Sequence, residues 1–103
     1  MAFAIETRID GSTIVVRVTG ELDAATASEV EDAIRQTSAD STERVVVDFT
    51  DLEFIDSSGL SVLVAAHKRL GTVGASLELR GAQPSVARVF AIAGLDKVLT
   101  ITE

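Results

Sequence analysis

The sequence of 103 residues contains no cysteine, no tryptophan and no tyrosine, and only one histidine. The absence of cysteine excludes both a disulfide framework and a thiolate metal site. A single histidine makes no metal site, and four phenylalanines without tryptophan or tyrosine give no platform for stacking nucleic-acid bases. The composition therefore favours neither a metalloprotein nor a nucleic-acid-binding protein.

Long apolar runs and excess positive charge are also missing. No apolar stretch approaches the roughly 18 residues of a membrane span, and the N-terminus MAFAIETRID lacks the basic and apolar regions of a signal peptide. The formal net charge of −7 repels phosphate backbones and anionic lipids. We therefore expect a soluble, cytoplasmic protein that binds neither nucleic acid nor membranes directly.

What the chain does contain is a core's worth of apolar residues, 47% of the total. This length and composition suit one domain over residues 1–103. The apolar period switches repeatedly between that of a strand and that of a helix. Strands are predicted at 3–9, 12–18, 44–49, 75–80 and 97–101, and helices at 24–38, 57–70 and from Pro84 to a stop at Gly94. This order predicts an α/β fold with a mixed sheet of about five strands, mostly parallel after an N-terminal hairpin.

The predicted crossover brings two distant loops together. The strands at 12–18 and 44–49 are joined by a helix, so they should be parallel. The loops that follow them, 20–23 and 50–56, then leave the same edge of the sheet, where such folds usually place their sites. We therefore expect Asp23 and Ser57 to be neighbours.

The segment Asp56-Ser57-Ser58-Gly59-Leu60 stands at the predicted start of the second helix. Leu60, Leu63, Val64 and Leu70 are expected on the buried side of this helix. Capping is one interpretation of the motif, since aspartate and serine are both strong N-caps. Capping does not explain Gly59, because glycine in a first turn is up to about 1 kcal/mol weaker than alanine. Its use suggests that something approaches the backbone closely.

Two catalytic or ligand-binding interpretations fit the motif poorly. A serine hydrolase lacks its G-x-S-x-G elbow, and His67 on the same helix lies about 15 Å from Ser57. A nucleotide-binding loop lacks the lysine of G-x-x-x-x-G-K-[ST] and the G-x-G-x-x-G spacing.

Phosphorylation is the third interpretation of the serines. It adds about −1.5 to −2 charge, which a helix N-terminus favours by about 0.3–1 kcal/mol. The effect on a docked partner is larger. The phosphate adds to the negative charge of Asp56 and Asp23, and like charges brought together across an interface cost several kcal/mol. These magnitudes favour a binding switch over a folding switch. Both Ser57 and Ser58 lie in the first turn, so these arguments do not choose between them.

The sequence resembles the STAS domains, and most closely the bacterial anti-sigma factor antagonists, over essentially its whole length. The segments that carry the resemblance are TGELDAATA at 19–27, VVVDFTDLEFIDSSGLSVL at 45–63 and VFAIAGLDKVLTI at 89–101. The resemblance implies a sheet with helices on one face. It implies a partner that is both anti-sigma factor and serine kinase, whose binding frees a sigma factor. It also implies that the kinase phosphorylates Ser57 to end the interaction, and that a serine phosphatase reverses it.

The resemblance also assigns the site residues. Ser57 would be the phosphoacceptor, with Asp56, Ser58, Gly59, Leu60 and Asp23 in the docking surface. The protein would then be a substrate and switch rather than an enzyme, with no cofactor, no metal and no catalytic residue of its own. We expect a monomer. The alternative is a constitutive subunit of a larger complex, such as a stressosome or a lipid-transport ATPase, in which Ser57 is only a helix cap.

Overall fold

The computed structural model describes residues 2–37 and 41–103, and within them one sheet of six strands is covered by helices. The strands are β1 (Ala4–Asp10), β2 (Thr13–Leu22), β3 (Arg44–Asp48), β4 (Leu52–Ile55), β5 (Ser76–Arg80) and β6 (Thr100–Thr102). The helices are α1 (Ala27–Thr37), α2 (Ser57–Thr72), α3 (Pro84–Ile92) and the short 3-10 helix η1 (Leu95–Lys97).

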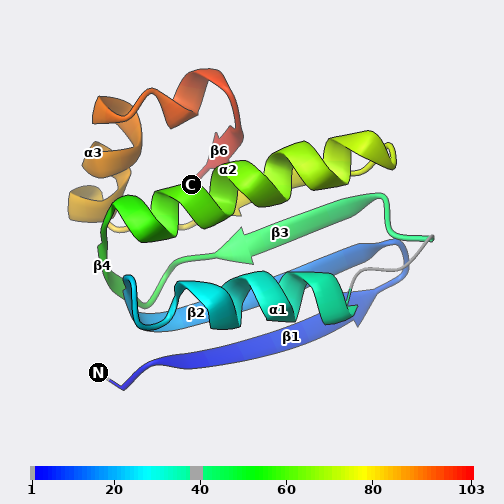
Figure 1. Cartoon of the computed structure of the whole chain (residues 1–103), viewed down its shortest axis with the longest axis horizontal. Helices are drawn as coiled ribbons and strands as arrows, with labels where there is room; N and C mark the ends of the chain where they lie inside the picture. The colour runs from blue at the N-terminus through cyan, green and yellow to red at the C-terminus, as the bar shows by residue number, and fades with distance from the viewer. Residues whose placement is uncertain (1, 38–40) are drawn as a thin grey trace.

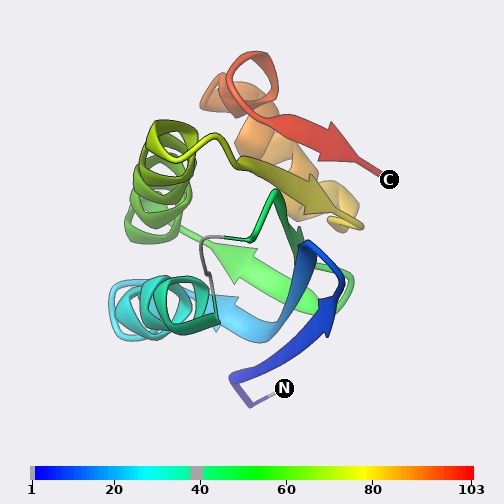
Figure 2. The same ribbon diagram turned by 90° about the vertical axis from the view of Figure 1, so that its right-hand side faces the viewer.

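The sheet confirms the predicted mixed topology. Its strand order is β1-β2-β3-β5-β6, with β4 paired to the end of β2. Only the β1–β2 hairpin is antiparallel, and the other pairs are parallel. Helices α1 and α2 lie side by side in front of the sheet, and α3 lies beyond α2 (Figure 1). Figure 2 shows α1 and α2 nearly end-on, on one side of the strands.

The core lies between the sheet and these helices because the strands alternate. Every second residue of β2 is completely or almost completely buried, as are Val30 and Ile34 of α1. Phe90 of α3 meets Phe49, with ring centroids 5.8 Å apart. Pro84 occupies the first turn of α3, as predicted.

Several predicted boundaries are wrong. The strand expected at 12–18 continues to Leu22 as β2, because Gly20–Leu22, expected in a loop, pair with β4. The expected loop at 50–56 contains β4, in which Leu52 and Ile55 are buried and the two residues between them are exposed. The expected strand at 97–101 is preceded by η1 and begins only at Thr100, because Leu95 and Leu99, both buried, are spaced for a helical turn. The helix expected at 24–38 begins at Ala27, and its predicted end at residue 38 lies outside the described residues.

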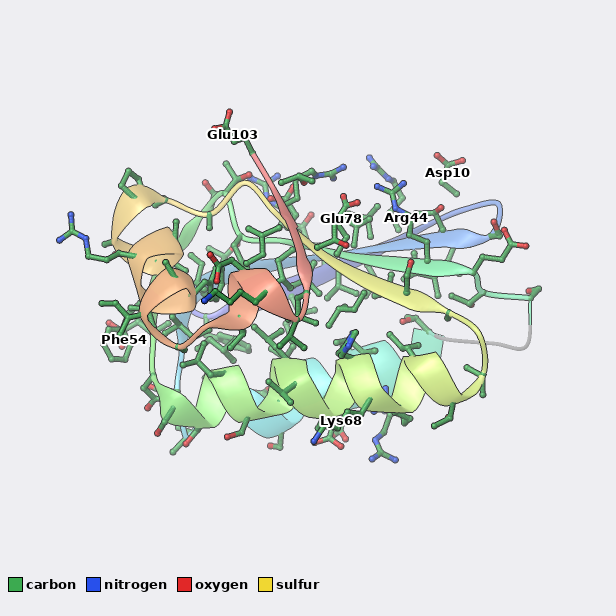
Figure 3. The ribbon with its side chains drawn as sticks, turned by 90° about the horizontal axis from the view of Figure 1, so that it is seen from above. Asp10, Arg44, Phe54, Lys68, Glu78 and Glu103 are labelled. Atoms are coloured by element: carbon green, nitrogen blue, oxygen red, sulfur yellow. The ribbon has the colours of Figure 1, made fainter. Side chains whose placement is uncertain are left out.

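The face of the sheet turned away from the helices carries paired charges. Arg44 Nη2 lies 2.7 Å from Glu78 Oε1, and Figure 3 shows both side chains on the side opposite α2. Val46, opposite Glu78 in the β3–β5 register, is only 1% exposed. Long charged side chains can shield apolar surface with their stems. The side chains of Arg44 and Glu78 can therefore keep Val46 from solvent on this face, which lies opposite the helices.

Asp48 on the same face predicts a specific pH dependence. Burial opposes its ionisation, but Thr50 donates two hydrogen bonds to its Oδ1, and together with the charges of Arg80 and Arg17 these hold the pKa of Asp48 below its ordinary value. A carboxyl with a lowered pKa stabilises the fold above its unfolded pKa of about 4, and this stability is lost as pH falls through the folded pKa. We therefore expect the difference in unfolding free energy between wild type and Asp48→Asn to be largest near pH 7 and to shrink below about pH 4. Urea unfolding across this range measures it, and a constant difference would contradict the assignment.

Candidate functional site

The candidate site forms where the ends of β2 and β4 meet. Leu22 pairs with Ile55, and the Asp56 N–H donates to the Leu22 carbonyl at 3.2 Å. The loop after β2 and the start of α2 are therefore adjacent. This confirms the predicted proximity of the Asp23 and Ser57 segments, which are far apart in the sequence.

Asp56 supplies the cap of α2. Its Oδ1 accepts hydrogen bonds from the backbone N–H groups of Ser58 at 2.9 Å and Gly59 at 3.2 Å. Ser57 is the first residue inside the helix. The interpretation of Ser57 as only a helix cap is thus wrong, because its neighbour performs that role.

We expect Asp56→Ala to lower the free energy of unfolding by about 1 kcal/mol, since two N–H groups lose their acceptor. Asp56→Asn keeps an acceptor oxygen in the same place and should retain most of this stability. Urea denaturation of both variants measures the effect. Equal losses in the two variants would mean that charge, rather than capping, makes Asp56 important for stability.

The two serines differ in accessibility. Ser57 is exposed, whereas Ser58 is half-buried. The Ser57 carbonyl accepts a hydrogen bond from Ser61 Oγ at 2.9 Å, but the Ser57 hydroxyl has no hydrogen-bond partner among the described residues. A change at that hydroxyl would therefore break no hydrogen bond among the described residues.

Gly59 is buried, and the close approach predicted there is internal. A Cβ at this position would lie 2.8 Å from side-chain carbons of both Ile55 and Leu22, and 3.0 Å from the Leu22 carbonyl oxygen. The expectation that Gly59 belongs to the docking surface is therefore corrected: this glycine lets α2 sit directly on β2 and β4. This close packing also fixes the position of Ser57 at the start of α2.

Leu60 and Val64 pack against the core on the buried side of α2, as predicted, but are only partly covered. Leu63 and Leu70 are buried as expected, but Leu60 and Val64 are half-buried. Both also line a groove of about 470 Å³ that runs along α2 from Ser57. The groove is lined by Ser57, Leu60, Ser61, Val64, Ala65 and Lys68.

Asp23 is half-buried and held by its own loop. Its N–H donates to Thr26 Oγ1 at 3.0 Å, and its Oδ1 accepts from the Ala25 N–H at 3.0 Å. Glu21, at the end of β2 just before this loop, is exposed. This segment therefore adds fixed negative charge beside the start of α2, where Asp56 already supplies one carboxylate.

Phe54 is a surface residue that the sequence did not single out. Its side chain is 48% exposed, two residues before Asp56. Figure 3 shows it at the end of the molecule where α2 begins, beside α3. The sequence does contain a signal for Phe54, because it is a large apolar residue within an acidic segment. The prediction of a loop at 50–56 did not explain that residue. Exposed aromatic residues are typical anchors of protein interfaces.

Other kinds of site find little support in the part of the chain that the structure describes. That part contains no group of three or more histidine, cysteine, aspartate or glutamate residues placed to hold a metal ion. None of its helices combines the length and apolar character needed to cross a membrane. His67 is half-buried and lies ten residues after Ser57 on the same helix.

Known proteins resemble this chain along nearly its entire length. The family model of the STAS domain matches residues 4–103. The anti-sigma-B factor antagonist of Staphylococcus aureus is 30% identical over 103 residues, which cover all of this chain and 95% of that protein. In both comparisons the matched region includes the Asp23 loop and the start of α2.

Solved structures give the same result. An anti-sigma factor antagonist from Mycobacterium paratuberculosis is 31% identical, with a TM-score of 0.87 over 98% of this chain and 86% of that one. The phosphorylated form of the Bacillus cell fate determinant SpoIIAA is 26% identical, with a TM-score of 0.71 over 99% of this chain and 92% of that one. The chain therefore belongs to the STAS domain family, among its anti-sigma factor antagonists.

Proposed function

We propose that this protein binds an anti-sigma factor that is also a serine kinase, and that phosphorylation of Ser57 ends the complex. The observation that carries the proposal is the exposed Ser57 hydroxyl, which makes no hydrogen bond among the described residues while Asp56 caps the helix. A phosphate on this oxygen would leave the cap and the core in place. The modification would therefore act on the surface of the protein rather than on its fold.

The charges around Ser57 support a switch in binding. Asp56 and Asp23 already make this edge acidic, so a partner that fits it presents positive charge or hydrogen-bond donors. Adding about two negative charges at Ser57 places more negative charge beside Asp56 and Asp23 than the partner's positive groups are matched to, which weakens binding. The dipole of α2 offsets only about 0.3–1 kcal/mol of the change. The phosphate would also occupy the space of any partner group that contacts the Ser57 hydroxyl.

The phosphoryl chemistry belongs to the partners. The Ser57 oxygen attacks the γ-phosphorus of kinase-bound ATP, ADP leaves, and the hydroxyl proton passes to a base of the kinase. A serine phosphatase restores the hydroxyl by hydrolysis. In this role the protein is a substrate and binding module rather than an enzyme. It would act as a monomer in the cytoplasm, where ATP and sigma factors are found.

A kinase assay tests this assignment. The wild-type chain, Ser57→Ala and Ser58→Ala are each incubated with γ-labelled ATP and the purified anti-sigma factor kinases encoded by the same genome. We expect one kinase to label wild type and Ser58→Ala, and to leave Ser57→Ala unlabelled. Label retained by Ser57→Ala and lost by Ser58→Ala would move the site to the neighbouring serine. No label on any chain would favour a constitutive subunit.

A further inference from the structure

Gln83 stands at the N-cap position of α3, but its side chain caps nothing. Its backbone is extended, as at an N-cap, yet the side chain makes no capping hydrogen bond. Helices favour serine, threonine, aspartate or asparagine at this position, as α2 does with Asp56. The first turn of α3 also holds no acidic residue to suit the helix dipole. A helix start that departs from these local rules is expected where the residue has another role.

The side chain of Gln83 reaches a different loop instead. Its Nε2 donates to the Thr50 carbonyl at 3.0 Å, which joins the loop after β5 to the turn before β4. Both loops leave the same edge of the sheet, since Asp48 and Arg80 are paired at the ends of the parallel strands β3 and β5. Gly81 lets the loops meet closely, because its φ is +75° and a Cβ there would lie 2.6 Å from Thr50 Oγ1. Both Gly81 and Gln83 therefore favour contact between these two loops.

The turn before β4 is held from two sides. Next to the Thr50 carbonyl, the Asp51 carbonyl accepts a hydrogen bond at 3.2 Å from the N–H of Gly20 in β2. Among the described strands β4 pairs only with β2, and α3 packs against it. Figure 1 shows β4, α3 and the start of α2 at the same end of the molecule. Because β4 runs directly into Asp56 and Ser57, the contacts that hold its entry also help to fix these two residues.

We propose that Gln83 is a positioning residue for the Ser57 site, because it leaves α3 uncapped and ties the turn that leads into β4. The proposal rests on the proposed function, since the kinase is the partner that reads the position of Ser57. A partner that binds only the ordered form has its apparent affinity reduced by the fraction of molecules in that form. Loss of the tie should therefore raise the KM of the kinase for this chain and leave kcat unchanged.

Two substitutions of Gln83 separate the tie from the cap. Gln83→Ser removes the tie and supplies a good N-cap, so the folding equilibrium constant measured by urea unfolding should rise about threefold. Gln83→Met removes the tie and supplies no cap, so stability should not rise. Both variants should raise the KM for phosphorylation of Ser57 about 3- to 10-fold at unchanged kcat. Gln36→Ser makes the same change at an exposed position of α1 and should keep the KM of wild type.

Amide hydrogen exchange measures the same tie without any partner. The Leu52 N–H bonds to the Phe49 carbonyl at the entry of β4, and the Asp56 N–H bonds to the Leu22 carbonyl at its exit. Both amides should exchange several-fold faster in the two Gln83 variants, through local opening, while amides of β3 should not.

The two readouts separate this inference from the proposed function. An unchanged KM in both Gln83 variants, with a kinase that phosphorylates the wild-type chain, would overturn the positioning role and leave the switch intact. If no kinase phosphorylates the wild-type chain, the proposed function fails, and exchange at the Asp56 amide decides the positioning role alone. Faster exchange there in both variants would support it, and exchange like that of wild type would overturn it.

Discussion

Ser57→Asp is expected to leave the protein folded and to weaken its binding to the anti-sigma factor by at least about 100-fold. The fold survives because Ser57 is exposed, its hydroxyl has no partner among the described residues, and Asp56 supplies the cap. Binding does not survive, because the partner's donors are already matched to Asp56 and Asp23, so the added carboxylate is buried unpaired in the interface at a cost of several kcal/mol, and each 1.4 kcal/mol is tenfold in affinity. Titration calorimetry measures the affinity, and urea unfolding measures the stability.

Two further variants control for this result. Ser76→Asp adds the same charge at the start of β5, an exposed position that follows the far end of α2, and should bind like wild type. Ser57→Ala removes the hydroxyl without adding charge and should bind within a few-fold of wild type. If Ser57→Asp instead unfolds the domain, the serine has a structural role that the contacts at Asp56 do not reveal. If Ser76→Asp binds as poorly as Ser57→Asp, net charge rather than position controls the interaction.

Gly59→Ala is expected to destabilise the protein by about 1–3 kcal/mol, the usual cost of overpacking a filled site. The added methyl would lie 2.8 Å from carbons of Leu22 and Ile55. Relief would require α2 to move away from β2 and β4, and that movement would also displace Ser57. We therefore expect weaker binding to accompany the loss of stability.

Gly71 provides the matched control, because it lies in the same helix and a Cβ added there would meet nothing within 4 Å. Gly71→Ala should raise stability by up to about 1 kcal/mol, as alanine does in a helix. The two substitutions in α2 should thus have opposite signs in urea unfolding. Two losses of similar size would mean that the contact with β2 and β4 is not what sets the cost at Gly59.

The sequence predicted the topology well because its signals were strong and local. The Asp10-Gly11 turn marks the hairpin, and the crossover rule places β2 and β3 in parallel. β4 escaped prediction because a strand of four residues with its two buried side chains at the ends does not alternate. Its pairing with β2 also follows a register shift between Gly20 and Glu21, which no pattern in the sequence marks.

The candidate site was predicted in position but not in detail. The crossover rule brought Asp23 and Ser57 together, and the family resemblance selected Ser57. The sequence left capping open because aspartate and serine stand side by side and both are good caps. Only hydrogen-bond geometry assigns the cap to Asp56. Two other features depend on β4 and could not be predicted without it. They are the packing of Gly59 against Leu22 and Ile55, and the exposure of Phe54.

Phosphopeptide analysis of the protein isolated from its own host, across growth phases and stress, tests the central claim most directly. Trypsin should release residues 45–68, which contain Ser57, Ser58 and Ser61, so fragment spectra must localise the phosphate within this peptide. The proposed switch predicts a single phosphate on Ser57, in a fraction of molecules that changes with growth conditions. A chain that stays unmodified under all conditions, or a phosphate found only on another residue, would contradict it.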